Sequence, residues 1–255
     1  MMELVESADG TGIAFDRAGS GPPLVIVLGA FGDRATSKPL AALLAASYTV
    51  YEYDRRGRGD SDNGLPCSIE REVEDLAAVV AAAGRPPFVY GHSSGGMLAL
   101  EAAARAVEMR GLAVYEPPYT GDHDPGPEFG QRLDELVAAG RRDLAAEQWL
   151  AMTGTPPGVI ESIKRSPGWA HRQALAHTLS QDLRLSRGGH VPIERFKRID
   201  APVLAMAGGA SPPWAASTIA TLCDALPHAR EHIVERQQHI PADPVVAAIL
   251  GSFFR

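Results

Sequence analysis

The sequence has few of the residues that build disulfide frameworks and metal centres. Its 255 residues include two cysteines, Cys67 and Cys223, which lie far apart and form no C-x-x-C pair. This usage is typical of a reduced compartment and excludes both a disulfide framework and a cysteine-rich zinc site. No H-E-x-x-H or similar ligand spacing occurs, so we expect neither a metal nor another cofactor.

Positive charge and long apolar runs are scarce as well. Lys and Arg number 24 against 31 Asp and Glu, a formal net charge of −7, which argues against a nucleic-acid surface. The longest apolar runs, such as LAAVVAAAG (76–84), are too short to span a bilayer, and the acidic, polar start MMELVESADG is unlike a secretory signal. We therefore expect a soluble cytoplasmic protein that acts on a small molecule, with no nucleic-acid or membrane partner. Its oligomeric state is open.

The chain does contain enough apolar residues for a substantial core, at 45% of the sequence. Five short runs are rich in aliphatic residues and apolar on both faces, which is typical of buried parallel strands. They are PPLVIVLGA (22–30), YTVYEYD (48–54), PFVYG (87–91), GLAVYE (111–116) and PVLAMAGG (202–209). Helical patterns lie between them. This alternation predicts an α/β fold whose mostly parallel sheet has right-handed crossovers and flanking helices.

The ends of the chain follow other patterns. Two short segments flank the turn-like DGTG within residues 3–19, which predicts an antiparallel hairpin at the edge of the sheet. REHIVE (230–235) reads as a last strand, and PVVAAILGSFF (244–254) as a closing helix that Asp243 caps. Ser68 is the expected cap of an earlier helix, and a further helix is expected over 94–109.

The strand–helix alternation breaks after Glu116. The Pro- and Gly-rich connector PPYTGDHDPGPE is followed by roughly seventy residues of helical pattern, up to about Phe196, with no convincing strand. We expect a helical cap, residues 117–196, inserted into a core formed by residues 1–116 and 197–255.

The pentapeptide GHSSG, which starts at Gly91, matches G-x-S-x-G between a predicted strand and a predicted helix. A nucleophile at such a sharp turn needs small residues two positions before and after it. Centred on Ser93 these are Gly91 and Gly95, whereas centring on Ser94 would put the bulky His92 there. The spacing therefore selects Ser93 as the nucleophile. It leaves the N–H of Ser94, at the helix N-terminus, to bind a developing oxyanion.

Two other interpretations of this glycine-rich segment are possible from its residues. One is a strand-to-helix turn without chemistry, against which the strand–turn–helix context argues. The other is a phosphate loop, which fails because Met97 stands where that motif requires lysine.

Four motifs in order resemble the α/β-hydrolase family, over essentially the whole chain. They are LGAFGDR (28–34), YDRRGRGDS (53–61), GHSSGG (91–96) and QQHIPADP (237–244). The chain looks most like the small bacterial esterases and haloperoxidase-like members that carry a helical cap. The resemblance implies the α/β-hydrolase fold and a reaction class, but not a substrate.

The resemblance also implies roles for two further residues. Ala30 would give the other oxyanion N–H, although Leu28 stands where the family usually has a histidine, and a plain glycine-rich turn is the alternative. His239 would be the base, because it alone among eight histidines follows the last strand on a loop before the final helix.

The acid is less clear from the sequence. The family most often places it after the strand represented by PVLAMAGG, but Ala210, Ser211 and two prolines follow here. Some members carry it after the preceding strand, which points to Glu116. The alternatives are that Glu116 lines the connector or meets an arginine of the cap, with Ser211 as a neutral orienter or no acid at all.

Two aromatic residues are candidates for contact with a substrate: Phe31, beside the oxyanion loop, and Trp214, after a strand end. The charged loop from Asp54 to Asp60 is interpreted by default as a structural network of salt bridges and turns.

Together these residues predict a serine hydrolase that cleaves a small, largely apolar ester, lactone or thioester through an acyl-enzyme. A second hypothesis keeps the site but changes the chemistry to perhydrolysis, C–C cleavage or a lyase step. A third is a non-catalytic ligand-binding homologue.

Overall fold

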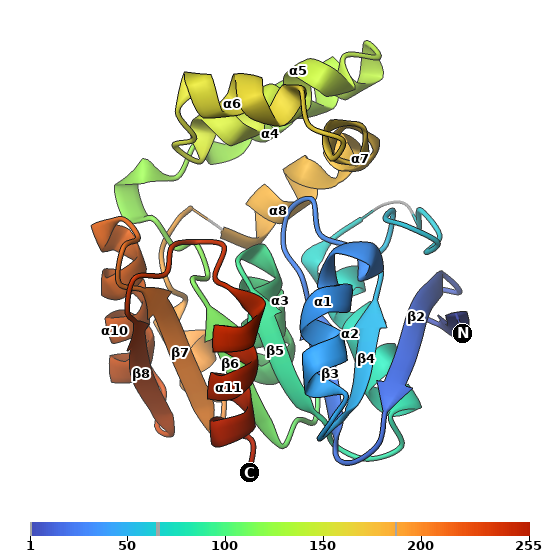
Figure 1. The fold of residues 1–255 in the computed structure, drawn as a ribbon, viewed down its shortest axis with the longest axis vertical. Helices are drawn as coiled ribbons and strands as arrows, with labels where there is room; N and C mark the ends of the chain where they lie inside the picture. The colour runs from blue at the N-terminus through green and yellow to red at the C-terminus, as the bar shows by residue number, and fades with distance from the viewer. Residues whose placement is uncertain (1, 65–66, 187) are drawn as a thin grey trace.

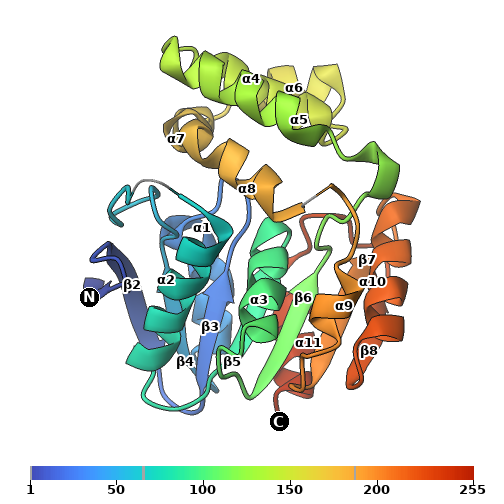
Figure 2. The ribbon, with the colours of Figure 1, turned by 180° about the vertical axis from the view of Figure 1, so that it is seen from behind.

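An eight-stranded sheet with helices on both faces forms the body of the protein (Figures 1 and 2). The computed structural model describes residues 2–64, 67–186 and 188–255. The strands are β1 (Met2–Glu6), β2 (Gly12–Gly19), β3 (Pro23–Val27), β4 (Thr49–Tyr53), β5 (Phe88–His92), β6 (Gly111–Tyr115), β7 (Val203–Gly208) and β8 (Ala229–Val234). Their order in the sheet is β1-β2-β4-β3-β5-β6-β7-β8, and the pairs from β4 to β8 are parallel.

The two antiparallel pairings lie at the N-terminal edge. β1 pairs with β2, and β2 pairs with β4. The turn between the first two strands is closed by a hydrogen bond from the Ser7 N–H to the Thr11 carbonyl, 2.8 Å long. The fold class predicted from the sequence is confirmed here: a mostly parallel sheet with an N-terminal hairpin and flanking helices.

The central strands are the apolar runs of the sequence. Every residue of β3, β6 and β7 is buried, which explains why these strands show no alternation of apolar and polar residues. The edge strand β8 keeps most of its residues exposed.

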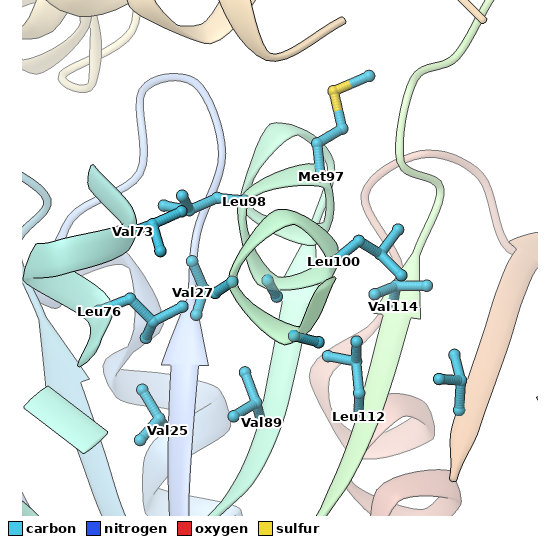
Figure 3. Close-up of a cluster of buried hydrophobic side chains, with 14 of the residues drawn as sticks. Val25, Val27, Val73, Leu76, Val89, Met97, Leu98, Leu100, Leu112 and Val114 are labelled. Carbon is cyan, nitrogen blue, oxygen red and sulfur yellow. The ribbon is translucent and has the colours of Figure 1, made fainter. Parts of the chain in front are cut away.

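Helices cover both faces of the sheet. One face carries α1 (Arg34–Leu44) and α11 (Asp243–Phe253), and the other carries α2 (Ile69–Ala82), α3 (Ser94–Ala104) and α10 (Pro213–Ala225). Figure 3 shows α3 set among apolar side chains, with Leu98 beside Val73 and Leu100 beside Val114. This packing fixes the N-terminal end of α3, which directly follows Ser93.

Two helix boundaries differ from the sequence-based expectation, and one agrees with it. Ser68 caps α2 by accepting a hydrogen bond from the Arg71 N–H, as predicted. The helix after the two serines ends at Ala104 rather than continuing to residue 109. Asp243 is not a cap: Ala242 occupies the N-cap position, and Asp243 is the first residue of α11, where its charge favours the helix dipole.

Between β6 and β7 the chain forms helices that lie beyond the carboxyl ends of the parallel strands (Figures 1 and 2). We call the following elements the cap helices: α4 (Gly126–Ala138), α5 (Arg142–Met152), α6 (Pro157–Lys164), α7 (Trp169–Leu175) and α8 (Leu179–Ser186). A short helix, α9 (Ile193–Phe196), leads back to β7. Helix α8 packs against both α4 and the core helix α3, so it joins the cap to the sheet layer. The division of the chain at residues 117 and 196 stays a prediction.

Within the described residues, no helix combines the length and apolar character needed to cross a membrane.

Candidate active site

Ser93 lies at the apex of the turn between β5 and α3. Its φ of +56° and ψ of −130° are a strained conformation for a non-glycine residue, and its N–H donates to the Tyr115 carbonyl at 2.9 Å. The neighbouring glycines are required by space: a Cβ on Gly95 would lie 2.2 Å from the Val27 carbonyl oxygen, and one on Gly91 only 2.6 Å from the Cα of Gly96. The small residues on which the choice of Ser93 rested are therefore needed for this turn.

The structure brings Ser93, His239 and Glu116 into one chain of hydrogen bonds. The His239 Nε2 lies 3.0 Å from the Ser93 Oγ, and its Nδ1 lies 2.7 Å from the Glu116 Oε2. Each residue follows the carboxyl end of a different strand: β5, β8 and β6. A carboxylate on Nδ1 favours the tautomer whose Nε2 is free to accept the proton of the Ser93 hydroxyl.

Glu116 is held in this position by its own surroundings. The residue is fully buried and adopts a φ of +46°, and its Oε1 accepts a 2.7 Å hydrogen bond from the Gly208 N–H. Burial alone would raise the pKa of Glu116, but hydrogen bonds, chiefly from His239 and then from the Ser211 side chain and the Gly208 N–H, lower it below its usual value. The carboxyl group is thus ionised at neutral pH.

The loop that carries His239 is held by three hydrogen bonds to three successive carbonyl groups. The Ala210 N–H donates to Gln237 at 2.9 Å, the Tyr115 hydroxyl to Gln238 at 2.7 Å, and the His92 Nε2 to His239 itself at 2.7 Å. Burial and the neighbouring His239 lower the pKa of His92 to about 4, so its ring is neutral and can donate from Nε2. The structure thus makes His92 an anchor for His239.

The two predicted oxyanion donors, the N–H groups of Ser94 and Ala30, belong to segments that meet at Ser93. Ser94 is the first residue of α3, and Ala30 lies in the turn after β3. In the part of the chain that the structure describes, neither N–H donates to another backbone group. The turn approaches the elbow closely, because a Cβ on Gly29 would lie 2.9 Å from the Ser93 Cβ. This spacing suits a pair of oxyanion donors.

The side chain of Ser94 has a different partner. Its hydroxyl donates to the Asp182 Oδ1 of α8 at 2.7 Å, and the residue is buried. This hydrogen bond holds the Ser94 hydroxyl on the cap carboxylate, so it is not placed to act as a nucleophile. The same carboxylate binds Arg55 and Arg58, which follow β4. The sequence pointed to an arginine cluster in this loop but assigned it only a structural role. Nothing local marks Asp182, which lies in an ordinary polar helix.

The two predicted aromatic residues have different neighbours. Phe31 has a φ of +58° and packs, together with Ala30, on a cap cluster built around Leu133, Trp149 and Leu179. The Trp214 ring centre is 6.2 Å from that of His239. Within the described residues, no group of three or more His, Cys, Asp or Glu side chains is arranged to hold a metal ion.

The sequence profile of the alpha/beta hydrolase family matches residues 24–248 of this chain. The chain belongs to that family. A solved alpha/beta hydrolase from Sphaerobacter thermophilus superimposes on it with a TM-score of 0.91, at 44% identity over 99% of this chain and 100% of the other.

Two curated relatives of this hydrolase have names that state a reaction. BpoC of Mycobacterium tuberculosis, provisionally named a non-heme bromoperoxidase, is 26% identical over 246 residues, covering 86% of this chain and 87% of the relative. A pimeloyl-[acyl-carrier protein] methyl ester esterase of Xanthomonas oryzae is 37% identical over 101 residues, 39% of this chain and 38% of the esterase. The reactions named for these two relatives differ.

Proposed function

We propose that this hydrolase is a serine esterase that cleaves a small, largely apolar ester, lactone or thioester. His239 takes the proton of the Ser93 hydroxyl as its oxygen attacks the substrate carbonyl, and the N–H groups of Ala30 and Ser94 bind the oxyanion. Glu116 orients the imidazole and stabilises its charged form. His239 then protonates the leaving alcohol or thiol (for a lactone, the ring oxygen, which stays attached). A water deprotonated by His239 hydrolyses the acyl-enzyme and restores the Ser93 hydroxyl.

The observation that carries this proposal is the unbroken hydrogen-bond chain from Ser93 through His239 to the buried Glu116. A ligand-binding homologue without chemistry would have no need for a strained serine, a base at 3.0 Å and an ionised acid at 2.7 Å in one line. This alignment also favours Glu116 as the acid over a site that lacks one. Ser211, the alternative orienter, acts on the carboxyl of Glu116 instead, whose pKa its side chain helps to lower.

The apolar substrate is supported by the surroundings of the two N–H donors. Ala30 and Phe31 border an apolar cluster of the cap, and the indole of Trp214 lies on the His239 side. Such walls favour acyl and leaving groups without charge. The named activity of the Xanthomonas relative, a methyl ester esterase, is in the same reaction class.

Labelling with a fluorophosphonate tests the assignment. We expect one adduct per chain in the native protein and none in Ser93→Ala, while Ser94→Ala, which keeps its backbone N–H, still reaches one adduct per chain. Hydrolysis of p-nitrophenyl acetate should follow the same pattern. Adduct formation that survives in Ser93→Ala would contradict the proposal.

Perhydrolysis is a second candidate, favoured by the similarity to BpoC over most of the chain. In this reaction hydrogen peroxide replaces water as the nucleophile that attacks the acyl-enzyme, so the products are a peracid and the free Ser93 hydroxyl. Adding peroxide and bromide to the ester assay distinguishes the two: bromination that depends on Ser93 supports perhydrolysis, and its absence leaves hydrolysis.

A further inference from the structure

A single carboxylate of the cap connects with both sides of the proposed oxyanion hole. Asp182 is buried in α8, and its Oδ1 accepts hydrogen bonds from the Ser94 hydroxyl and from Arg55, both at 2.7 Å. Arg58 donates to both Asp182 oxygens, at 2.8 and 3.0 Å. The three charged groups are each no more than 3% exposed.

The two arginines extend this contact to the turn that carries Ala30. Arg58 donates to the Gly29 carbonyl, and at 3.2 Å to that of Gly32, while Arg55 reaches the Leu28 carbonyl at 3.3 Å. These carbonyl groups lie on both sides of Ala30. Its N–H therefore belongs to a turn that is fixed on both sides by guanidinium groups.

The charges of this cluster balance only when Asp182 is present. Arg55 also pairs with Glu72 through two hydrogen bonds, of 2.6 and 2.9 Å, so Glu72 compensates one guanidinium and Asp182 the other. An uncompensated buried charge would have to move toward solvent or lose its partners. Removing the charge of Asp182 should therefore displace Arg58 first, and with it the turn at Gly29.

From this geometry we infer that Asp182 is a positioning residue for the reaction. It holds the Ala30 turn through Arg55 and Arg58, and it holds the N-terminal end of α3 through the Ser94 hydroxyl. The N–H groups of Ala30 and Ser94 therefore form an oxyanion hole only when α8 of the cap is packed against the core. The inference rests on the proposed serine hydrolase function. Asp182 does not contact the reacting atoms, because its oxygens are used by Ser94 and the two arginines.

Its contribution should appear in transition-state binding. A donor that is misplaced by a fraction of an ångström still allows the ground-state carbonyl to bind, but it stabilises the oxyanion less. Loss of a whole donor costs about 100- to 1000-fold in kcat. We expect Asp182→Asn, which shifts the turn without removing a donor, to lower kcat by about 10- to 100-fold and to change KM by less than about 3-fold.

The chain offers a matched control for a buried ion pair. Asp75 is as buried as Asp182 and accepts two 2.7 Å hydrogen bonds from Arg56, but this pair contacts neither the Ala30 turn nor the elbow. Asp75→Asn should lower thermal stability to a similar degree and leave kcat of the folded enzyme within about 2-fold. If Asp182→Asn does not fold, Arg58→Lys becomes the test variant in place of Asp182→Asn, and Arg56→Lys becomes the control in place of Asp75→Asn. Lysine keeps the charge but cannot span a carboxylate and two carbonyls, so Arg58→Lys should also lose about 10-fold in kcat.

The experiment measures p-nitrophenyl acetate turnover and inhibition by a trifluoromethyl ketone, which forms a tetrahedral oxyanion on Ser93. A parallel loss of kcat and of inhibitor affinity in Asp182→Asn or Arg58→Lys, absent from the controls, supports the positioning role. Equal kcat in test and control variants overturns it while the esterase proposal stands. Native enzyme without turnover that depends on Ser93 overturns the proposed function, and the positioning role with it.

Discussion

The substitution Glu116→Gln tests the acid of the proposed triad most directly, because it changes charge at nearly constant shape. Glu116 uses both oxygens: Oε1 accepts from the Gly208 N–H and Oε2 faces the His239 Nδ1, each at 2.7 Å. Glutamine has only one oxygen. If that oxygen stays with Gly208, the amide NH₂ donates to Nδ1 and fixes the tautomer that cannot take the proton of Ser93.

The opposite orientation of the glutamine restores the productive tautomer but sets its NH₂ against the Gly208 N–H. A buried unsatisfied donor costs about 1–3 kcal/mol. The carboxylate also attracts the imidazolium by about 4 kcal/mol at an effective dielectric constant of 20. Because His239 is 41% exposed, solvent screens part of this attraction, and we retain about half. The cost of the unsatisfied donor and the lost attraction together are about 3–5 kcal/mol, which corresponds to a loss of about 10²- to 10⁴-fold in kcat.

The assay is ester turnover under saturating substrate, with thermal unfolding as the check on folding. Glu52→Gln is the matched control, since Glu52 in β4 is likewise a buried glutamate, and it accepts a 2.7 Å hydrogen bond from the Ser37 hydroxyl, remote from the triad hydrogen bonds. It should keep kcat within about 2-fold. A folded Glu116→Gln enzyme with kcat within about 3-fold of the native value would refute the reasoning.

Two further predictions concern stability. The pKa of His92 is lowered to about 4 in the folded chain, against about 6.5 when unfolded, so the unfolded chain binds more protons in between and stability falls as pH drops from 6.5 to 4. Urea unfolding of His92→Gln at several pH values should show a shallower dependence, and equal slopes would contradict this. Gly95→Ala puts a Cβ 2.2 Å from the Val27 carbonyl and should lower the unfolding free energy by about 1–3 kcal/mol or more, whereas Gly251→Ala, with open space around it in α11, should not destabilise.

Much of the fold could be predicted because its signals are local. Strand after strand was recognisable as a short apolar run, since a parallel strand buried on both faces cannot include polar positions. The elbow was recognisable for a similar reason. Only glycine fits at 91 and 95, because the backbone of one segment lies against that of another there. The steric requirement is therefore visible in the sequence as two glycines.

Helix ends were predicted less well. The run after Ser94 continues with good helix formers to residue 109, yet α3 stops at Ala104. Ala106 adopts a φ of +62° as the chain turns toward β6. Tertiary packing decides such an end, because a helix that crosses a sheet must stop where the sheet does.

The residues that support the site were harder to see. Arg55 and Arg58 are visible in the sequence as a charged loop, but their partner Asp182 lies more than a hundred residues away. Likewise, the Tyr115 hydroxyl reaches the Gln238 carbonyl across the end of the sheet. No spacing rule connects such pairs, since the crossovers of the sheet alone bring them together.

By itself, the sequence determined the parallel sheet, the N-terminal hairpin and the position of Ser93, because burial on both faces and steric crowding at a tight turn restrict residue type locally. It supplied Glu116 and His239 only as candidates. The tertiary structure decided that they meet, since the carboxyl ends of β6 and β8, on either side of β7, bring the carboxyl of one loop within 2.7 Å of the imidazole of another. It also decided that Asp182 joins the cap to the Ala30 turn, because a buried carboxylate must lie where two guanidinium groups can compensate it.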